Sequence, residues 1–229
     1  MGAGIFSKKD PTEKARQICR KKFLYYFKNG YSDPKYIEWE RQYKLDAHFQ
    51  FQQALNKREY DRLLLSRKFS EIALTAVRIE SRTNLLFSFE KMALRDAVKP
   101  ASGARAFAAG LYQYVYGKAS LEERFNEFSQ VIASLPRKQT RVHTWPLQTV
   151  FGFIANPQEH IFLKPRVTQI AAEKYRFDFH YRSQPNWETY KSLLDFAEQV
   201  RKGTNDLKPQ DYIDLQSFIW VMGSDEYPD

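Results

Sequence analysis

The 229-residue sequence contains one cysteine, four histidines and nine glycines, and these small numbers exclude several kinds of site. Cys19 has no second cysteine to pair with, so the chain can form neither an internal disulfide nor a zinc site built from thiolates. No two histidines have the short spacing of a metal site built on one helix. The glycines form no phosphate-binding loop, and no nucleophile elbow is present. We therefore expect no metal and no cofactor.

Long apolar runs are also missing. No segment reaches the ~20 apolar residues needed to cross a bilayer, and the first residues lack the apolar centre of a secretory signal. The opening MGAGIFS is similar to a myristoylation signal, but Phe6 stands where that signal needs a hydroxyl residue. We therefore expect a soluble, cytoplasmic protein that does not bind membranes.

Lys and Arg are absent after Lys208, so the end of the chain is acidic although the formal net charge is +9. Residues 8–28 and 137–182 carry excess positive charges of six and five. Clustered Lys and Arg favour a polyanionic partner such as nucleic acid, because their binding to phosphates releases counterions. The alternative is a solvated surface on which the acidic tail folds over a basic face.

Helix start and stop signals recur along the whole chain. Asp10 followed by Pro11 starts one helix, and Ser120 with Glu123 forms a capping box that starts another. We predict one all-α domain of about ten helices with at most one or two short extended segments. Residues 1–134 form its N-terminal helical part with a basic first helix, and residues 135–229 form a hairpin-like C-terminal part packed on the first.

Apolar residues at helical spacing predict the core of this domain. The expected core residues are Trp39, Phe69, Ile72, Leu86, Phe89, Met92, Leu111, Phe125, Phe151, Phe153, Leu193, Phe196, Phe218 and Ile219.

The stretch YRFDFHYR, residues 175–182, alternates aromatic and polar side chains. Asp178 and His180 are two residues apart, so in an extended chain they point the same way, and the aspartate could orient the histidine as a base. The alternative is an extended connector between two helices, with its aromatic residues in the core and its charges in water. A lone strand would have no partner, which favours the connector.

The order of elements from Leu135 to Val221 resembles the helix-hairpin-helix DNA glycosylase superfamily. LPRKQTRVHTWPLQTVFGF is similar to the hairpin and its second helix, and NPQEHIFLKPRVTQIAAEKY to the segment that carries the family's catalytic aspartate. Arg137, Lys138 and Gln139 replace the hairpin glycines, and Leu163, Lys164 and Pro165 stand around the aspartate's place. The resemblance therefore implies binding to the nucleic-acid backbone and does not imply base excision.

The whole chain, with phrases such as RTNLLFSFEKMALRDAV and DLQSFIWVMGSDEYPD, also resembles a widespread bacterial protein family without an assigned activity. That resemblance implies a bacterial origin and adds no mechanism.

The leading hypothesis is a module that binds nucleic acid through its phosphate backbone. Trp145 is a candidate stacking ring, with core packing before Pro146 as its alternative. An enzyme that uses the same basic cleft is the second hypothesis, with Lys164 as nucleophile or Asp178 and His180 as an acid–base pair. A structural or protein-binding domain without a ligand is the third. The candidate nucleic-acid-binding residues are Arg137, Lys138, Arg141, Trp145, Lys164, Arg166, Arg176 and Arg182.

The final segment, GSDEYPD, contains no basic residue and follows an apolar helix. We expect it to lie on the basic surface and to compete with phosphate, so that deleting residues 224–229 raises the affinity for nucleic acid and steepens its salt dependence. The alternative is a tail without a partner.

Overall fold

The computed structural model describes residues 10–138 and 141–229, and within them every regular element is a helix or helical turn. The prediction of an all-α protein is thus confirmed. None of the helices in these two ranges is long and apolar enough to span a bilayer. The expectation about MGAGIFS, together with Gln139, lies outside the described residues.

Within residues 10–138 and 141–229, twelve α-helical segments follow one another with short connections. A π-helical turn, Ile37–Arg41, joins α2 to α3, and 3-10 turns lie at Gly30–Ser32 and Asn205–Leu207. The segments in this part of the chain are α1 (Pro11–Tyr26), α2 (Pro34–Tyr36), α3 (Gln42–Leu55), α4 (Lys57–Leu65), α5 (Phe69–Ser81), α6 (Ser88–Val98), α7 (Ala101–Tyr116), α8 (Leu121–Ser134), α9 (Trp145–Ala155), α10 (Pro165–Tyr175), α11 (Trp187–Gly203) and α12 (Tyr212–Gly223).

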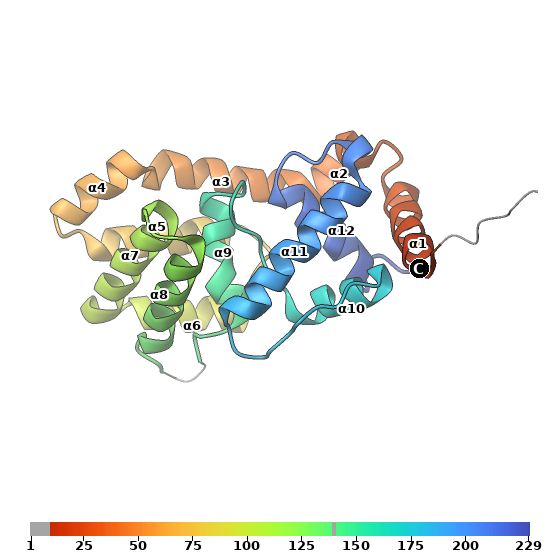
Figure 1. Ribbon diagram of the computed structural model, residues 1–229. Coiled ribbons are helices and arrows are strands. Elements are labelled where there is room, and N and C mark those ends of the chain that lie inside the picture. The colour runs from red at the N-terminus through yellow and green to blue at the C-terminus, as the bar shows by residue number, and fades with distance from the viewer. Residues whose placement is uncertain (1–9, 139–140) are drawn as a thin grey trace, which may run out of the picture.

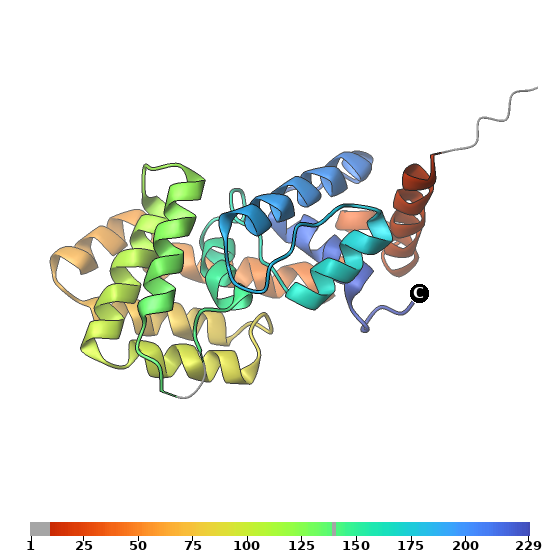
Figure 2. The same cartoon turned by 60° about the horizontal axis from the view of Figure 1, so that its bottom comes forward.

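The molecule is elongated, with α4 to α8 at one end and α1, α10, α11 and α12 towards the other (Figure 1). Helix α9 lies between these groups, and every one of its residues is buried. Helix α1 packs against α10 and α12, a neighbourhood that the turned view also shows (Figure 2). The basic first helix therefore lies beside the basic segment of the C-terminal part.

The predicted helix starts are formed by the predicted side chains. The Asp10 carboxylate accepts a hydrogen bond from the Thr12 amide at 3.1 Å. In the Ser120–Glu123 capping box, the Ser120 hydroxyl accepts from the Glu123 amide at 3.2 Å, and the Glu123 carboxylate accepts from the Ser120 amide at 2.9 Å. These bonds satisfy amides that the first turn of a helix leaves unpaired.

Most of the predicted core is buried, but three of its members are exposed and were placed wrongly: Trp39 (51% exposed), Phe89 (51%) and Met92 (57%). Trp39 lies in the π-helical turn, which breaks the spacing used to place it, and the Lys35 ammonium lies 4.1 Å from its ring centroid. Phe89 and Met92 share the solvent-facing side of α6, because Ala93, Leu94, Ala97 and Val98 take the buried side. Phe69 is only partly buried.

A buried polar network fixes α12 against the start of α3. The Arg41 guanidinium donates to the Asp211 carboxylate at 2.8 Å and to the Asp214 carboxylate at 2.7 Å. The Tyr36 hydroxyl donates to Asp214 at 2.5 Å, and the Lys44 ammonium donates to the Ser217 hydroxyl at 2.8 Å. Because α12 is held in this way, the position of the chain that follows it is fixed as well.

Residues 177–182 form the expected connector between α10 and α11 and are not a strand. Arg176 ends α10 in the left-handed conformation, at φ 57°. The aromatic side chains of the connector pack on the core and its charged side chains face solvent, as the alternation predicted. These aromatic side chains are Phe177, Phe179 and Tyr181, and Tyr175, the last residue of α10, is buried as well.

Candidate functional site

Four of the predicted binding residues come together around one cavity of about 640 Å³. We call it the aromatic pocket. Its walls come from the start of α6, the start of α9, the start of α10, the connector and the chain after α12. The predicted residues in its lining are Arg141, Trp145, Lys164 and Arg166, and its other aromatic members are Phe87, Phe89, Tyr181 and Trp220.

Lys164 occupies the base of this pocket, where it precedes the first turn of α10. The residue is 9% exposed, and its ammonium donates to the Leu85 carbonyl at 2.9 Å. The same nitrogen lies 3.5 Å from the centroid of the Phe87 ring, a cation–π contact. Burial lowers the pKa of Lys164, and the nearby carboxylates of Glu90 and Glu80 oppose that shift.

Phe87 and Phe89 form an exposed, stacked pair at the mouth of the pocket. Their ring centroids are 5.6 Å apart and their planes are inclined by 19°. About half of each residue is open to solvent. The local cause is the start of α6, where the Glu90 carboxylate accepts from the Phe87 amide at 3.0 Å and fixes the chain before the first turn.

Two buried carboxylates lie behind this pair. Glu90 also accepts a hydrogen bond from the Thr144 hydroxyl at 3.2 Å, which connects α6 to the start of α9. Burial raises the pKa of Glu80 to about 7, and the Lys91 ammonium, 3.9 Å away, only partly offsets that effect. The second carboxylate oxygen of Glu80, Oε2, has no hydrogen-bond partner.

Trp145 is a wall of the pocket and not an open ring. It is buried, and its indole N–H donates to the Arg182 carbonyl at 2.8 Å. The core-packing alternative for Trp145 is therefore the one that the structure supports. The exposed rings that could stack on a base in this pocket are those of Phe87 and Phe89.

The other candidate cations lie apart from this pocket. Lys138 is exposed, with its ammonium 4.0 Å from the Asp96 carboxylate, and Arg137 is exposed beside it. The Arg182 guanidinium pairs with Glu188 at 2.9 Å on the surface. Arg176 lines a second cavity, between α1 and α10.

Asp178 and His180 do come within hydrogen-bonding distance, at 3.2 Å. Their side chains are 95% and 71% exposed, and neither lines the aromatic pocket. Bulk water surrounds the pair, which therefore has no enclosed space in which to orient a substrate for acid–base chemistry.

The acidic tail lines the same pocket as the basic residues. Ser224, Asp225 and Glu226 line the pocket, and the Glu226 carboxylate accepts from the Trp220 indole N–H at 3.4 Å. Asp229 reaches the Lys22 ammonium at 2.6 Å and the Lys174 ammonium at 2.6 Å. The expectation that the tail lies on a basic surface is confirmed.

Sequence reasoning missed Phe87 and Glu90 as members of the site, and it placed Phe89 in the core. The available signal was FSFE, two phenylalanines next to a helix start, which is an unusual place for large apolar side chains unless they pack or bind. Among residues 10–138 and 141–229, no group of three or more His, Cys, Asp or Glu side chains could hold a metal ion. No protein-family model, curated protein or solved structure matches the chain.

Proposed function

We propose that the protein binds single-stranded nucleic acid at the aromatic pocket. The observation that carries the proposal is the exposed Phe87–Phe89 stack at the mouth of a cavity that Arg141 and Arg166 also line. Bases unpaired from a second strand stack on aromatic side chains, with a gain of about 1–3 kcal/mol per base. Cations beside the rings then hold the phosphates that connect those bases.

The charge distribution supports the same ligand. Arg141 and Arg166 are exposed, so each can reach a phosphate without leaving a buried partner unpaired. Lys164 adds a third positive charge under the rings, although its hydrogen bond to Leu85 keeps it inside the protein. We place this binding in the bacterial cytoplasm, as the resemblance to a bacterial family implies.

The experiment is a fluorescence-polarisation titration with labelled single-stranded DNA, single-stranded RNA and duplex DNA, at about 50 and about 200 mM salt. We expect the single strands to bind more tightly than the duplex, and binding to weaken as salt rises. A Phe87→Ala/Phe89→Ala double variant should lose about tenfold or more in affinity, because it removes the stacking surface.

Phe49→Ala is the matched control, since Phe49 is about as exposed as Phe87 and lies on α3, away from the pocket. Its affinity should equal that of the original protein. Absence of binding at the lower salt concentration, or an equal loss in the control and the double variant, would contradict the proposal.

A second candidate function rests on Lys164 itself. A desolvated lysine with a lowered pKa is the usual nucleophile for carbonyl compounds, because more of its amine is neutral near pH 7. The Lys164 nitrogen would attack an aldehyde carbon, water would leave, and an imine would join the two. Treatment with butanal and borohydride, followed by peptide mass spectrometry, should reduce that imine to a stable butyl group on Lys164. Labelling spread over exposed lysines and absent from Lys164 would remove this candidate.

A further inference from the structure

A second and larger cavity, of about 1090 Å³, lies between α1, α10 and the end of the chain. We call it the basic pocket. Four cationic side chains line it, two from α1 and two from α10 and its end, and none of them lines the aromatic pocket. These are Lys21, Lys22, Lys174 and Arg176.

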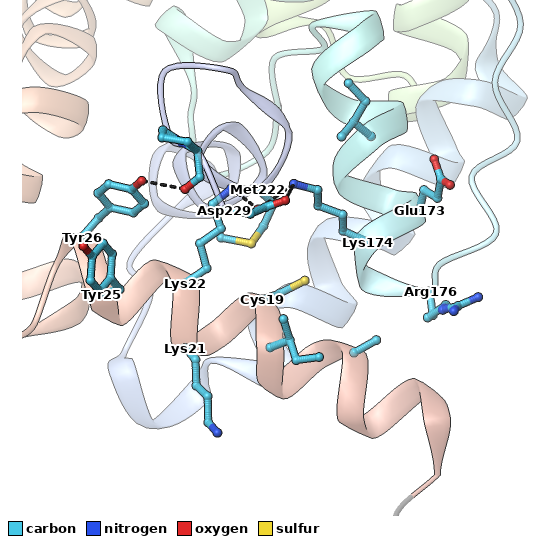
Figure 3. Close-up of a pocket in the computed structure, with 14 residues that line it drawn as sticks. Cys19, Lys21, Lys22, Tyr25, Tyr26, Glu173, Lys174, Arg176, Met222 and Asp229 are labelled. Carbon is cyan, nitrogen blue, oxygen red and sulfur yellow. Dashed lines mark hydrogen bonds and ion pairs between the residues drawn. The ribbon is translucent and has the colours of Figure 1, made fainter.

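Lys22 and Lys174 both form ion pairs with the Asp229 carboxylate, which lies between them (Figure 3). The Asp229 carboxylate accepts from the Lys22 ammonium at 2.6 Å, and both of its oxygens accept from the Lys174 ammonium, at 2.7 and 2.6 Å. The hydrogen bonds from Lys174 and Lys22 hold the pKa of Asp229 below its usual value. The Lys22 side chain is nine-tenths buried, so its ammonium has a fixed place in the wall of the pocket, whereas Lys174 lies nearer to solvent.

Displacement of the Asp229 carboxylate from the two lysines would break exposed contacts and leave the buried part of the tail in place. The Asp229 side chain is 67% exposed, and Pro228 is held by a hydrogen bond from the Tyr26 hydroxyl to its carbonyl, at 2.7 Å. Tyr227 is the anchor of the tail, because it is buried and its hydroxyl donates to the Glu40 carboxylate at 2.6 Å. Movement of Pro228 and Asp229 alone would therefore free both lysines without disturbing the core.

Apart from these cations, Asp229, the Glu173 carboxylate and the rings of Tyr25 and Tyr26, the lining of the basic pocket is apolar. Ala15, Ile18 and Cys19 from α1 face Ile170 from α10 and Met222 from α12. Ile18 is 59% exposed, an uncommon state for an isoleucine beside a cavity. Burial raises the pKa of the Cys19 thiol to about 11, so Cys19 is a neutral part of this wall.

We propose that the basic pocket binds a free single-chain anionic amphiphile, which is a carboxylate or phosphate head joined to a hydrocarbon chain. The head takes the place of the Asp229 carboxylate between Lys22 and Lys174. The chain lies on Ile18, Ile170 and Met222. Asp229 thus acts as a built-in competitor, which the ligand must displace.

The chemistry of the lining favours this ligand over nucleic acid or free phosphate. The volume exceeds what an inorganic ion needs and matches that of sites for small organic ligands. The lining between the cations is mainly aliphatic, which suits a hydrocarbon chain. Its two rings, Tyr25 and Tyr26, are inclined by 85° to each other and so do not form the row of parallel rings that strand binding uses. The proposal does not depend on the function of the aromatic pocket.

The test uses the full chain and the fluorescent fatty acid dansylaminoundecanoate, whose emission rises when it enters an apolar site. Decanoate and decyl phosphate should displace the probe, and decanol and inorganic phosphate should not. Lys22→Ala and Lys174→Ala should each weaken probe binding about tenfold, because each removes a charge-assisted hydrogen bond. Asp229→Asn should tighten it about threefold, because a neutral amide competes less well for the lysines.

Ile18→Glu tests the apolar half of the site and should weaken probe binding about tenfold. Its matched control is Leu65→Glu, an exposed aliphatic residue on α4, and Lys191→Ala is the control for the lysine variants. Both controls, and the Phe87→Ala/Phe89→Ala variant, should bind the probe like the original protein. Circular dichroism of each variant verifies that it is folded.

Three results would overturn the proposal. The first is a lysine variant that is folded and binds the probe unchanged. The second is displacement of the probe by an oligonucleotide, which would make the basic pocket a nucleic-acid site. The third is binding to vesicles of phosphatidylglycerol without displacement of the probe by decanoate, which would indicate a membrane surface.

Discussion

The ammonium nitrogen of Lys164 lies 3.5 Å from the centroid of the Phe87 ring, and both residues belong to the aromatic pocket. This contact joins the start of α10 to the start of α6, which are far apart in the sequence. The positive charge is held by a ring and by the Leu85 carbonyl, without a carboxylate in direct contact. A buried charge of this kind contributes less stability than a well-packed apolar side chain of the same length.

Replacement of Lys164 by methionine should therefore leave the protein as stable as before at pH 7, or more stable. The folded-state pKa of Lys164 lies below its ordinary 10.5, so the folded chain loses this proton first as pH rises. Between the lowered pKa of the folded state and the ordinary pKa of the unfolded state, the unfolded chain binds more protons than the folded chain, so the free energy of unfolding rises with pH. The advantage of the Lys164→Met variant should shrink over that window. Urea unfolding of both proteins at several pH values measures it, and an advantage that grows with pH would contradict the prediction.

Glu80→Gln should stabilise the protein at pH 8. Burial raises the pKa of Glu80 to about 7 from 4.5, so the folded chain holds this proton more tightly than the unfolded chain. The free energy of unfolding therefore falls as pH rises from 4.5 through 7, by at most about 3 kcal/mol. A neutral amide escapes this cost and can still accept from Thr83, whose hydroxyl donates to Glu80 at 3.2 Å.

Thermal unfolding of Glu80→Gln at pH 5 and pH 8 gives the comparison. The gain in stability should be larger at pH 8, because the original side chain is ionised there. Glu71→Gln, an exposed change on the same helix, is the control and should show little gain at either pH. A loss of stability at pH 8 would mean that the ion pair with Lys91 outweighs the cost of burial.

Arg41→Ala should destabilise the protein by about 3–5 kcal/mol, because the substitution leaves two buried carboxylates without their partner. Those carboxylates are Asp211 and Asp214, and burial already raises the pKa of Asp214. Urea unfolding monitored by circular dichroism measures the change. Arg62→Ala, which removes an exposed pair with Glu59, should cost far less stability. Similar losses in the two variants would contradict the assignment of the network as the fixing point of α12.

The fold could be predicted to the extent that its signals are local. Caps such as Asp10 and Ser120 act within four residues, so the sequence alone indicates where those helices start. Periodicity identifies the two faces of α6 but not which of them meets the rest of the protein. Phe89 and Met92 were placed on the wrong face for this reason.

The candidate site was predicted in part for the same reason. Arg141, Lys164 and Arg166 were expected to act together because they belong to one basic segment, but the sequence did not separate them from the other cations of that segment, which lie elsewhere. The burial of Lys164 depends on contacts with Leu85 and Phe87, about 80 positions earlier, and no local pattern shows such contacts. The position of α1 beside α10 is likewise decided by tertiary packing.

The acidic tail supplies a last prediction, and Tyr227 decides how it is best tested. Deletion of residues 224–229 would remove Tyr227 together with the acidic side chains, and would leave the buried Glu40 carboxylate without the hydroxyl that donates to it. That loss costs about 1–3 kcal/mol and would mix a change in stability with any change in binding. Neutralisation of Asp225 and Glu226, which are exposed and line the aromatic pocket, changes charge alone.

An Asp225→Asn/Glu226→Gln variant should bind single-stranded nucleic acid about threefold or more tightly than the original protein, because phosphates no longer meet two negative charges in the pocket that Arg141 and Arg166 line. The logarithmic salt dependence should become steeper, since more cationic side chains are available to displace counterions. Polarisation titrations across a salt series measure both quantities. Glu122→Gln/Glu127→Gln, on the exposed face of α8, makes the same change in net charge away from the pocket and should have a smaller effect. Equal affinities and equal slopes for the tail variant and the original protein would show that the tail does not compete with phosphate.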